Sequence, residues 1–432
     1  MKNRESQQRI VVTGTGLVTP LGCGVDYVWP RLLAGVCGIS KLADHIGEGT
    51  GVGVAGQVPT PELDPAAGYN PDALIPAKER KKMDRFIEFA LVAAHEALAQ
   101  ANWHPTDEAQ RQRTATVIGS GVGGFAAIAE AIRVTDTRGP RRLSPFSAPS
   151  FLANMAAGNV SIRFGFKGPL GAPVTACAAG VQAIGDAARL IRSGEADVAL
   201  CGGTEAAIDR VTLGCFDAAR ALSTGFNDKP AEASRPFDQG RDGFVMSEGA
   251  GLLVIESLEH ALARGATPLA ELVGYGTSAD AYHLTAGPAD GSGARQAMEQ
   301  ALRQGGISAA EVQHINAHAT STPVGDKGEL AAIRALFGTR AGLAVTATKS
   351  ATGHLLGAAG GVEAIFTVLA LRDQIVPPTL NLRTPDETAE GLNLVGPEAL
   401  ETPMTYALSN GFGFGGVNAS VLFRRWENLQ RE

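Results

Sequence analysis

The chain has 432 residues, of which 44% are hydrophobic and 19% charged, and its net charge is −7. This apolar content is ample for a large core, and the low charged fraction predicts that part of the surface is buried in an oligomer interface. The acidic balance excludes a basic footprint for nucleic acid or for a membrane surface.

The cysteines and the start of the chain indicate the compartment. The five cysteines are odd in number and lack disulfide or metal spacing, which fits a reducing environment. Residues 1–8 are polar and mixed in charge, unlike a signal or transit peptide, and no run of about 18 apolar residues predicts a membrane span. We therefore expect a cytoplasmic protein.

Strand-like apolar runs alternate with helical patterns along the chain, which predicts an α/β fold with largely parallel sheets. The pattern divides near residues 263–267, giving expected domains 1–264 and 265–432. In each half the third strand leads into a helix rich in glycine and alanine, which suggests a structural duplication without a residue-level repeat. The clearest strands are 9–13, 114–118, 174–176, 196–201 and 251–255, then 269–274, 312–317, 343–348, 407–411 and 419–423.

Three stretches of the first half read as irregular loops because they are rich in glycine, proline, aspartate and asparagine. They are 44–72, 136–150 and 225–243. Long loops in compact domains are often lids or binding edges, although capping the fold is an equal alternative.

Cys177 is the most informative residue, in the sequence VTACAAG. Apolar residues then recur at Val181, Ile184, Ala188 and Ile191, which predicts a helix that starts at the cysteine. A thiol in the first turn of a helix feels the positive end of the macrodipole, which favours the thiolate and hence a nucleophile. The alternative is a small core residue.

Two histidines follow in polar, glycine-rich settings. His318 lies at the end of a predicted strand, before Thr320, Ser321 and Thr322, and His354 follows Gly353. A cysteine with two such histidines suggests acyl transfer through a thioester, with a neutral imidazole donating to an oxyanion. His314 and His318 could instead form a metal pair, but no third ligand follows.

Lys349 precedes His354 and on its own would be a solvated surface lysine. Asp326 and Glu329 are its candidate carboxylate partners if the loops that carry them converge. Further on, residues 409–418 read SNGFGFGGVN, in which glycines flank Phe414. Such a loop places a backbone N–H in an oxyanion hole and swings an aromatic gate, or else forms a tight hairpin with an exposed ring.

The sequence GSGVGG at 119–124 follows a strand and matches the dinucleotide-binding pattern. No second strand ending in an acidic residue follows at the expected distance. We therefore do not expect a nucleotide site.

These motifs together resemble those of the β-ketoacyl-acyl carrier protein synthases, and of the type II elongating synthases most closely. The resemblance covers nearly the whole chain. It also rests on RIVVTG at 9–14, VTPLG at 18–22, SPF at 144–146, ALST at 221–224, SRPFD at 234–238 and RDGFV at 241–245.

The resemblance implies a thiolase-like fold, in which two similar halves stack as five layers, α-β-α-β-α, in a protein that is usually a homodimer. It implies a 3-oxoacyl-[acyl-carrier-protein] synthase that condenses a Cys177-bound acyl group with malonyl-acyl carrier protein in fatty acid elongation. No cofactor is implied, because phosphopantetheine arrives on the carrier protein. A ketosynthase of a specialised lipid or polyketide pathway is the alternative, and a non-condensing chain-length partner is disfavoured by Cys177.

The resemblance also implies roles for individual residues. His318 and His354 drive malonyl decarboxylation, Lys349 forms a structural ion pair with Glu329, and the N–H groups of Cys177 and Phe414 form the oxyanion hole. Substrate-binding residues are Thr320 and Thr322 for the phosphopantetheine arm and Val122, Phe216 and Phe412 for the substrate pocket. A structural monovalent cation is implied near Asn316, Glu363, Ser409 and Asn410. The small Val122 predicts good use of medium to long acyl chains.

Overall fold

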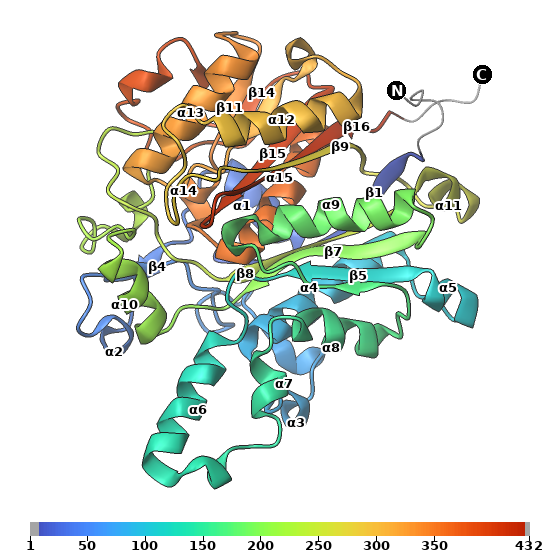
Figure 1. Ribbon diagram of the computed structural model, residues 1–432, viewed down its shortest axis with the longest axis vertical. Helices are drawn as coiled ribbons and strands as arrows, with labels where there is room; N and C mark the ends of the chain where they lie inside the picture. The colour runs from blue at the N-terminus through green and yellow to red at the C-terminus, as the bar shows by residue number, and fades with distance from the viewer. Residues whose placement is uncertain (1–7, 428–432) are drawn as a thin grey trace.

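The computed structural model describes residues 8–427 and arranges them in five alternating layers of helix and strand, as the resemblance implies (Figure 1). The expectation for the polar start of the chain concerns mainly residues 1–7, which lie outside the described residues. Within residues 8–427, no helix has the length and apolarity that a membrane crossing requires.

The first half contributes one half of the sheet. Its strands lie side by side in the order β6-β5-β7-β8-β1, and the short β2 pairs with β1. Their bounds are β1 Ile10–Thr19, β2 Gly22–Cys23, β5 Thr114–Gly119, β6 Leu170–Gly171, β7 Val198–Glu205 and β8 Gly249–Ser257.

The second half repeats this topology. Its strands lie in the order β11-β10-β15-β16-β9, so in both halves the chain order across the sheet is third, second, fourth, fifth, first. The bounds are β9 Ala270–Ala279, β10 His314–Asn316, β11 Ala344–Thr346, β15 Tyr406–Gly413 and β16 Val417–Arg425, with β13 Asn393–Leu394 as an additional edge. The duplication that the pattern suggested is therefore present in the strand topology.

The sheet is mixed, which corrects the expectation of a largely parallel one. In each half the second strand is parallel to the third and fourth. The edge strand β13 is also parallel to β11, and the other pairs of this sheet are antiparallel. The two halves also join into one sheet of 12 strands, because Val11 and Val12 of β1 pair with Glu271 and Ala270 of β9.

Two helices form the central layer, α9 Ala179–Arg192 and α15 Ala359–Asp373, and each packs on strands of both halves. Every residue of α15 from Ala359 to Leu371 is buried, as expected of a helix that is apolar on all sides. Small residues let the two helices approach closely: a Cβ added at Gly180 would lie 2.7 Å from the Gly361 nitrogen. The cysteine-bearing and histidine-bearing halves therefore meet in this layer.

The outer layers cover the two remaining faces. Helix α4 Arg85–Ala101 packs on β1, β7 and β8 of the first half, and α12 Ser292–Gly305 packs on β9 and β16 of the second half, beside α13 Pro323–Phe337. Separate apolar clusters lie under α4, in the central layer and under α12 and α13. The other helices are α1 Val25–Leu33, α2 Asp44–Gly47, α3 Ala77–Arg80, α5 Glu108–Gln112, α6 Phe125–Arg138, α7 Ser147–Phe151, α8 Met155–Phe164, α10 Arg210–Ala218, α11 Leu258–Ala263 and α14 Lys349–Thr352.

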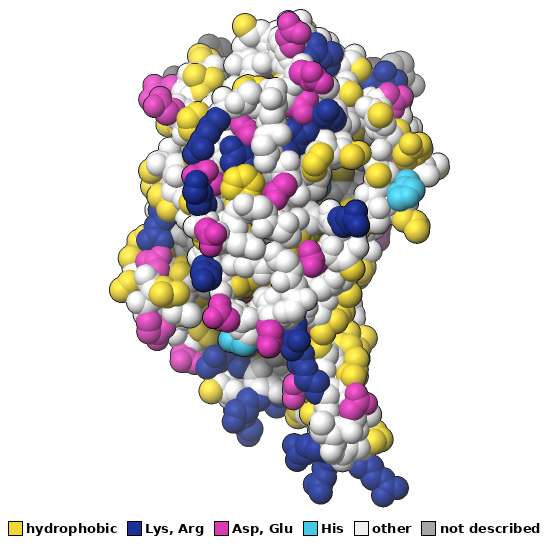
Figure 2. Space-filling model, turned by 90° about the vertical axis from the view of Figure 1, so that its left-hand side faces the viewer, with side chains coloured by type: hydrophobic (Ala, Val, Ile, Leu, Met, Phe, Trp, Pro, Cys, Tyr) yellow, Lys and Arg dark blue, Asp and Glu magenta, His cyan; other side chains and the backbone are white. Residues whose placement is uncertain are grey.

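The expected loops 44–72, 136–150 and 225–243 hold only short elements, such as β4 Val54–Ala55, which pairs with β3 Ser40–Lys41, and the ends of α6 and α7. A further two-stranded sheet joins β12 Ile375–Val376 and β14 Leu400–Glu401. Helices α6 and α7 form an arm that projects from the body (Figure 1). Figure 2 shows Lys and Arg side chains gathered at this projecting end, where Arg138, Arg141 and Arg142 are exposed.

The segment around Cys177 differs from the prediction. The expected strand 174–176 is absent; the strand is the shorter β6, and an irregular segment follows it. Cys177 lies in a 3-10 turn, Ala176–Ala178, and the α-helix starts one turn later, at Ala179. Ala176 has a φ of 50°, a conformation that is uncommon for a residue with a Cβ and occurs mostly in turns and at functional sites.

Candidate active site

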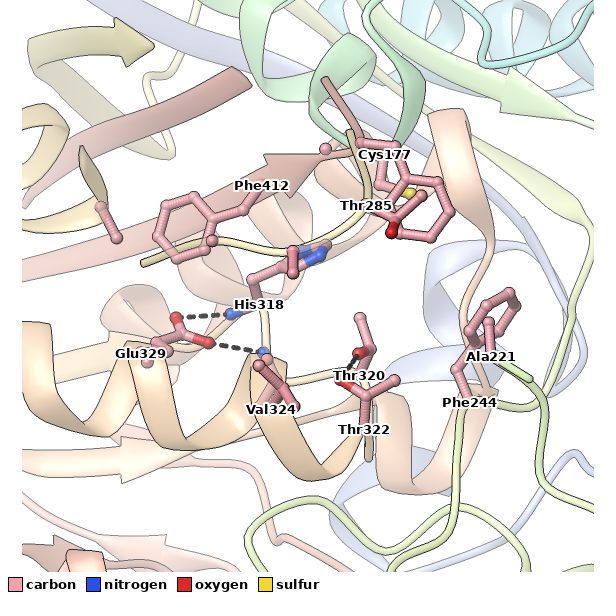
Figure 3. A pocket seen from close by; sticks show the side chains of 18 of the residues that line it. Cys177, Ala221, Phe244, Thr285, His318, Thr320, Thr322, Val324, Glu329 and Phe412 are labelled. Carbon is pink, nitrogen blue, oxygen red and sulfur yellow. Dashed lines mark hydrogen bonds between the residues drawn. The ribbon is translucent and has the colours of Figure 1, made fainter. Parts of the chain in front are cut away.

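The predicted residues converge on one cavity of about 440 Å³. Cys177 lies at its inner wall and the His318 ring points toward it (Figure 3). Cys177 comes from the first half of the chain and both histidines come from the second. The predicted residues that line the cavity are Cys177, Phe216, His318, Thr320, Thr322, Glu329, His354, Phe412 and Phe414, whereas Val122, Lys349, Asp326 and the predicted cation ligands do not line it.

The two histidine rings lie edge to face, with centroids 5.3 Å apart and planes at 84°. Phe412 contacts the His318 ring and Phe244 contacts the His354 ring, at centroid distances of 5.5 and 5.2 Å. Both histidines are buried, at 8% and 2% exposure. The aromatic rings therefore fix the orientation of both imidazoles at the cavity wall.

Hydrogen bonds decide which nitrogen of each ring carries the proton. The Lys349 ammonium lies 3.5 Å from His318 Nδ1, and the Leu356 N–H donates to His354 Nδ1 at 3.3 Å. Because both Nδ1 atoms face donors, each neutral ring carries its proton on Nε2. Burial, together with the Lys349 charge, holds the pKa of both histidines well below the usual value. Both rings are therefore neutral Nε2–H donors at neutral pH.

The environment of the thiol differs from the expected one. Burial raises the pKa of Cys177 to about 12, although the Lys349 charge opposes this shift. The resting nucleophile is therefore a thiol, and the 3-10 turn does not suffice to hold it as a thiolate. Its proton has to leave as the sulfur attacks.

The ion pair of Lys349 corrects the prediction. Its Nζ lies 2.5 Å from Glu363 Oε1 on α15, and both side chains are buried. Glu329 instead accepts hydrogen bonds from the backbone N–H groups of His318 and Ala319 at 2.8 and 2.7 Å, drawn in Figure 3, and from the side chain of Asn410. Both Glu329 oxygens therefore have hydrogen-bond partners, and Glu329 fixes the backbone at His318. The carboxylate that pairs with Lys349 is Glu363.

Asp326 also has a role other than the expected one. It forms an ion pair with the buried Arg241 at 3.4 Å and accepts the N–H groups of Phe237 and Ser321. Arg241 in turn donates to the carbonyl oxygens of Thr322 and Pro323 at 3.1 and 2.8 Å. This pair therefore shapes the loop that carries Thr320 and Thr322, whose hydroxyls hydrogen-bond to each other at 3.0 Å.

Residues 409–418 form the tight β15–β16 hairpin, and Phe414 at its tip is 40% exposed and lines the cavity. Gly415 and Gly416 at the turn have φ of 87° and 80°, which favour glycine. A Cβ added at Gly413 would lie 3.2 Å from the Cys177 nitrogen, so the strand end passes directly beside the cysteine backbone. The loop thus has both features that its sequence left open as alternatives, a hairpin and an aromatic ring at the cavity.

The glycine-rich loop 119–124 cannot hold a phosphate, because its N–H groups already have a carboxylate partner. Glu205, at the end of β7, accepts the N–H groups of Gly121 and Val122 at 2.7 and 3.3 Å and the Ser120 hydroxyl at 2.9 Å. The structure thus gives this loop a partner within the chain in place of a nucleotide phosphate. Val122 itself packs in an apolar cluster with Cys177 and Phe216.

The predicted cation ligands divide between two faces of the sheet. Asn316 and Ser409 are paired residues of neighbouring strands, and the Asn316 side chain lies 3.5 Å from the Glu363 carbonyl oxygen of α15. Glu363 Oε2 and Ser409 Oγ are buried and have no hydrogen-bond partner among the described residues. Asn410 faces away, toward Glu329. Glu363 and Ser409 therefore each keep a buried oxygen available to a small cation, and Asn316 lies beside them.

His314 does not form a metal site. It is buried in β10, its Nδ1 donates to the Ala344 carbonyl oxygen, and residues 8–427 contain no cluster of three or more His, Cys, Asp and Glu side chains that could hold a metal ion. The sequence reasoning missed Glu205 and Arg241. RDGFV had marked Arg241 as part of a motif, but no local pattern distinguishes Glu205 from any strand-end glutamate.

Comparison with known proteins agrees with this site. Residues 7–261 match the family described as beta-ketoacyl synthase, N-terminal domain, and residues 269–383 match its C-terminal domain. The chain belongs to the β-ketoacyl synthase family. A 3-oxoacyl-[acyl-carrier-protein] synthase 2 of Rhizobium meliloti (strain 1021) is 49% identical over 97% of this chain and 99% of its own length.

Two solved structures share the fold over nearly the whole chain. A beta-ketoacyl synthase of Burkholderia phymatum STM815 has a TM-score of 0.89 at 34% identity and covers 97% of this chain and 100% of its own. A ketosynthase of a type II PKS, in complex with its acyl-carrier protein and bound to a hexaketide, has a TM-score of 0.88 at 34% identity, with coverage of 98% and 100%.

The burial of Cys177 and the charge of Lys349 together predict how the reactivity of the thiol depends on pH. We expect the rate of Cys177 alkylation by iodoacetamide to keep rising with pH up to at least pH 10, because the thiol pKa is raised. Lys349→Met should slow alkylation at pH 9 about tenfold, because the positive charge that opposes the shift is lost. Mass spectrometry of the Cys177 peptide measures the rate, and the exposed Cys215 is the internal reference. A plateau below pH 8 would contradict the raised pKa.

Proposed function

We propose that this protein is a 3-oxoacyl-[acyl-carrier-protein] synthase that elongates fatty acids by decarboxylative condensation. The observation that carries the proposal is the pair of neutral Nε2–H histidines facing the same cavity as Cys177. One half-buried nucleophile and two neutral donors suit acyl transfer followed by enolate stabilisation. The relative from Rhizobium meliloti, which carries this name, supports the substrate class.

The first half-reaction is acyl transfer. Cys177 Sγ attacks the carbonyl carbon of an acyl thioester on the carrier protein and its S–H proton passes to the departing phosphopantetheine sulfur, so that a new thioester replaces the old one. The developing oxyanion accepts hydrogen bonds from the N–H groups of Cys177 and Phe414. The passage of Gly413 beside the Cys177 nitrogen supports this pairing.

The second half-reaction is condensation. Malonyl-carrier protein enters, its carboxylate leaves as CO₂, and the resulting enolate oxygen accepts hydrogen bonds from His318 and His354. The enolate carbon attacks the Cys177 thioester, the C–S bond breaks, and the sulfur takes a proton from solvent to restore the thiol. Neutral histidines suit this step, because they stabilise the enolate without protonating its carbon first.

The cavity suits the arm that delivers these groups. Thr320 and Thr322 offer hydroxyls along its wall to the amides of phosphopantetheine, and the exposed Arg220 at the cavity offers a guanidinium to its phosphate. The exposed arginines at the end of the α6 arm offer a further basic surface in a chain of net charge −7. An acyl carrier protein is therefore the partner that we propose.

The likeness to a ketosynthase of a type II PKS keeps a specialised pathway as the second candidate. The higher identity to a 3-oxoacyl-[acyl-carrier-protein] synthase 2 favours elongation. Cys177 and both histidines disfavour a non-condensing chain-length partner. All five cysteines are free in the structure, which supports the cytoplasm as the compartment.

Glu363 Oε2, Ser409 Oγ and the Asn316 side chain would hold a monovalent cation. Such an ion would neutralise the carboxylate oxygen that Lys349 does not contact, and its role would be structural. It supplies no step of the reaction.

A homodimer is the assembly that we propose. β6 is an edge of the sheet and exposes Leu170 (46%). Beside it, α8 exposes Ile162 (77%), and the segment after β6 exposes Val174 (54%). An unpaired edge with exposed apolar side chains is covered when the same edge of a second copy pairs with it. The low charged fraction of the chain fits a buried interface.

Intact-mass analysis tests the activity. We expect the protein to gain one acyl group from a saturated acyl carrier protein and to lose it when malonyl carrier protein is added. Cys177→Ala should gain no mass and form no 3-oxoacyl product, while unfolding at the wild-type temperature, because alanines already flank this turn. Product formation by the mutant would show that the nucleophile lies elsewhere.

The two histidines should separate the half-reactions. We expect His318→Ala and His354→Ala each to lower malonyl decarboxylation about a hundredfold to a thousandfold, because one oxyanion donor is lost. Self-acylation of Cys177 should fall much less, because it relies on backbone donors. His314→Asn is the matched control, since His314 is buried in the strand before His318 without lining the cavity. Equal loss in both half-reactions would refute this division.

Sedimentation tests the dimer. Ile162→Asp should convert the dimer to a monomer, because it places a charge in the apolar contact. Leu63→Asp is the control, since Leu63 is equally exposed (80%) but lies on the loop that follows β4. A dimer that resists Ile162→Asp would place the interface on another face.

A further inference from the structure

Glu205 does not line the cavity and takes no part in the proposed reaction. It is fully buried at the end of β7. In addition to Ser120, Gly121 and Val122, it accepts the N–H of Gly357 at 2.9 Å. One carboxylate therefore ties the glycine-rich loop of the first half to the turn that precedes α15 in the second half.

Both tied segments carry apolar side chains that pack beside Cys177 without lining the cavity. Val122 and Leu356 belong to the apolar cluster that includes Cys177 and Phe216. Leu356 also provides the N–H that holds His354 Nδ1. A shift of either segment would therefore change the shape of the cluster beside the nucleophile.

The space around the carboxylate leaves little freedom. A Cβ added at Gly121 would lie 2.7 Å from Glu205 Oε2, and one added at Gly357 would lie 2.8 Å from the same oxygen and 2.2 Å from the Gly121 nitrogen. The two segments and the Glu205 carboxylate can therefore pack this closely only because Gly121 and Gly357 have no side chain. Burial raises the pKa of Glu205 to about 7, so above this pH it is an anion that matches its four donors.

We infer that Glu205 is the positioning residue that sets the acyl chain length accepted at Cys177, by holding Val122 in its place in the apolar cluster beside Cys177 and Phe216. This inference rests on the proposed acylation of Cys177. Glu205→Gln would keep the size of the side chain but replace one carboxylate oxygen by an N–H₂ group. This donor would then face backbone N–H groups, which are also donors. The repulsion would displace the Val122 loop and disturb the cluster against which a long acyl chain would pack.

Self-acylation rates with six-carbon to sixteen-carbon acyl carrier proteins at pH 8 test the inference. Glu205→Gln should lower the ratio of sixteen-carbon to six-carbon rates about tenfold, with the six-carbon rate changed least. Ser120→Ala, which removes one donor and keeps the carboxylate, should shift the ratio in the same direction by a smaller factor. It keeps the test valid if Glu205→Gln does not fold.

Glu248→Gln is the matched control. Glu248 is also a buried glutamate, bonded to Arg85 and the Val58 N–H, and it does not line the cavity. We expect it to leave the chain-length ratio unchanged whatever its effect on stability. A uniform fall for Glu205→Gln, or an unchanged ratio in both Glu205→Gln and Ser120→Ala, would overturn the inference. Failure of the wild-type protein to acylate with any chain would instead refute the proposed function.

Discussion

The buried ammonium of Lys349 is the charge on which the rest of the site depends. It lies between Glu363, at 2.5 Å, and His318 Nδ1, at 3.5 Å, and none of these side chains is exposed beyond 8%. Together with burial, which is the larger cause, its charge keeps His318 neutral, and its position favours the proton on Nε2. The same charge opposes the burial that raises the pKa of Cys177. A lysine in an apolar interior is stable only with such a partner, which is why Glu363 on the central helix α15 is needed.

The duplicated topology explains how these groups meet. Each half places a helix after its third strand, and both helices pack in the central layer. Cys177 lies before the first of these helices, and His354 and Glu363 lie before and on the second. Because α9 and α15 approach at the Gly180–Gly361 contact, groups distant in the sequence come together beside one cavity. Catalysis in this account therefore needs both halves.

The sequence was sufficient to predict most of the strands and the residues around the cavity. A thiol in a small-residue turn and histidines after strands are local patterns, and the motifs of the family extend along the whole chain. The partner of Lys349 was not predictable in this way. Glu329 was the candidate because it follows His318 closely in the sequence. In the structure, however, its carboxylate already accepts hydrogen bonds from the backbone N–H groups of His318 and Ala319.

Two further features depend on packing alone. Glu205 accepts the hydrogen bonds of the loop that resembles a nucleotide-binding pattern, and it lies 85 residues after Ser120 in the sequence. The positive φ of Ala176 belongs to the 3-10 turn that precedes α9. The apolar periodicity of residues 181–191 predicts the helix but carries no information on this turn. Interactions between distant segments decide both features.

The central claim is that His318 and His354 are neutral and carry their protons on Nε2. Nitrogen NMR of protein labelled with ¹⁵N-histidine tests it directly, with His318→Ala and His354→Ala spectra for assignment. At pH 7 both rings should give one protonated Nε2 and one unprotonated Nδ1 signal. An imidazolium at either position, or a proton on Nδ1, would contradict the account.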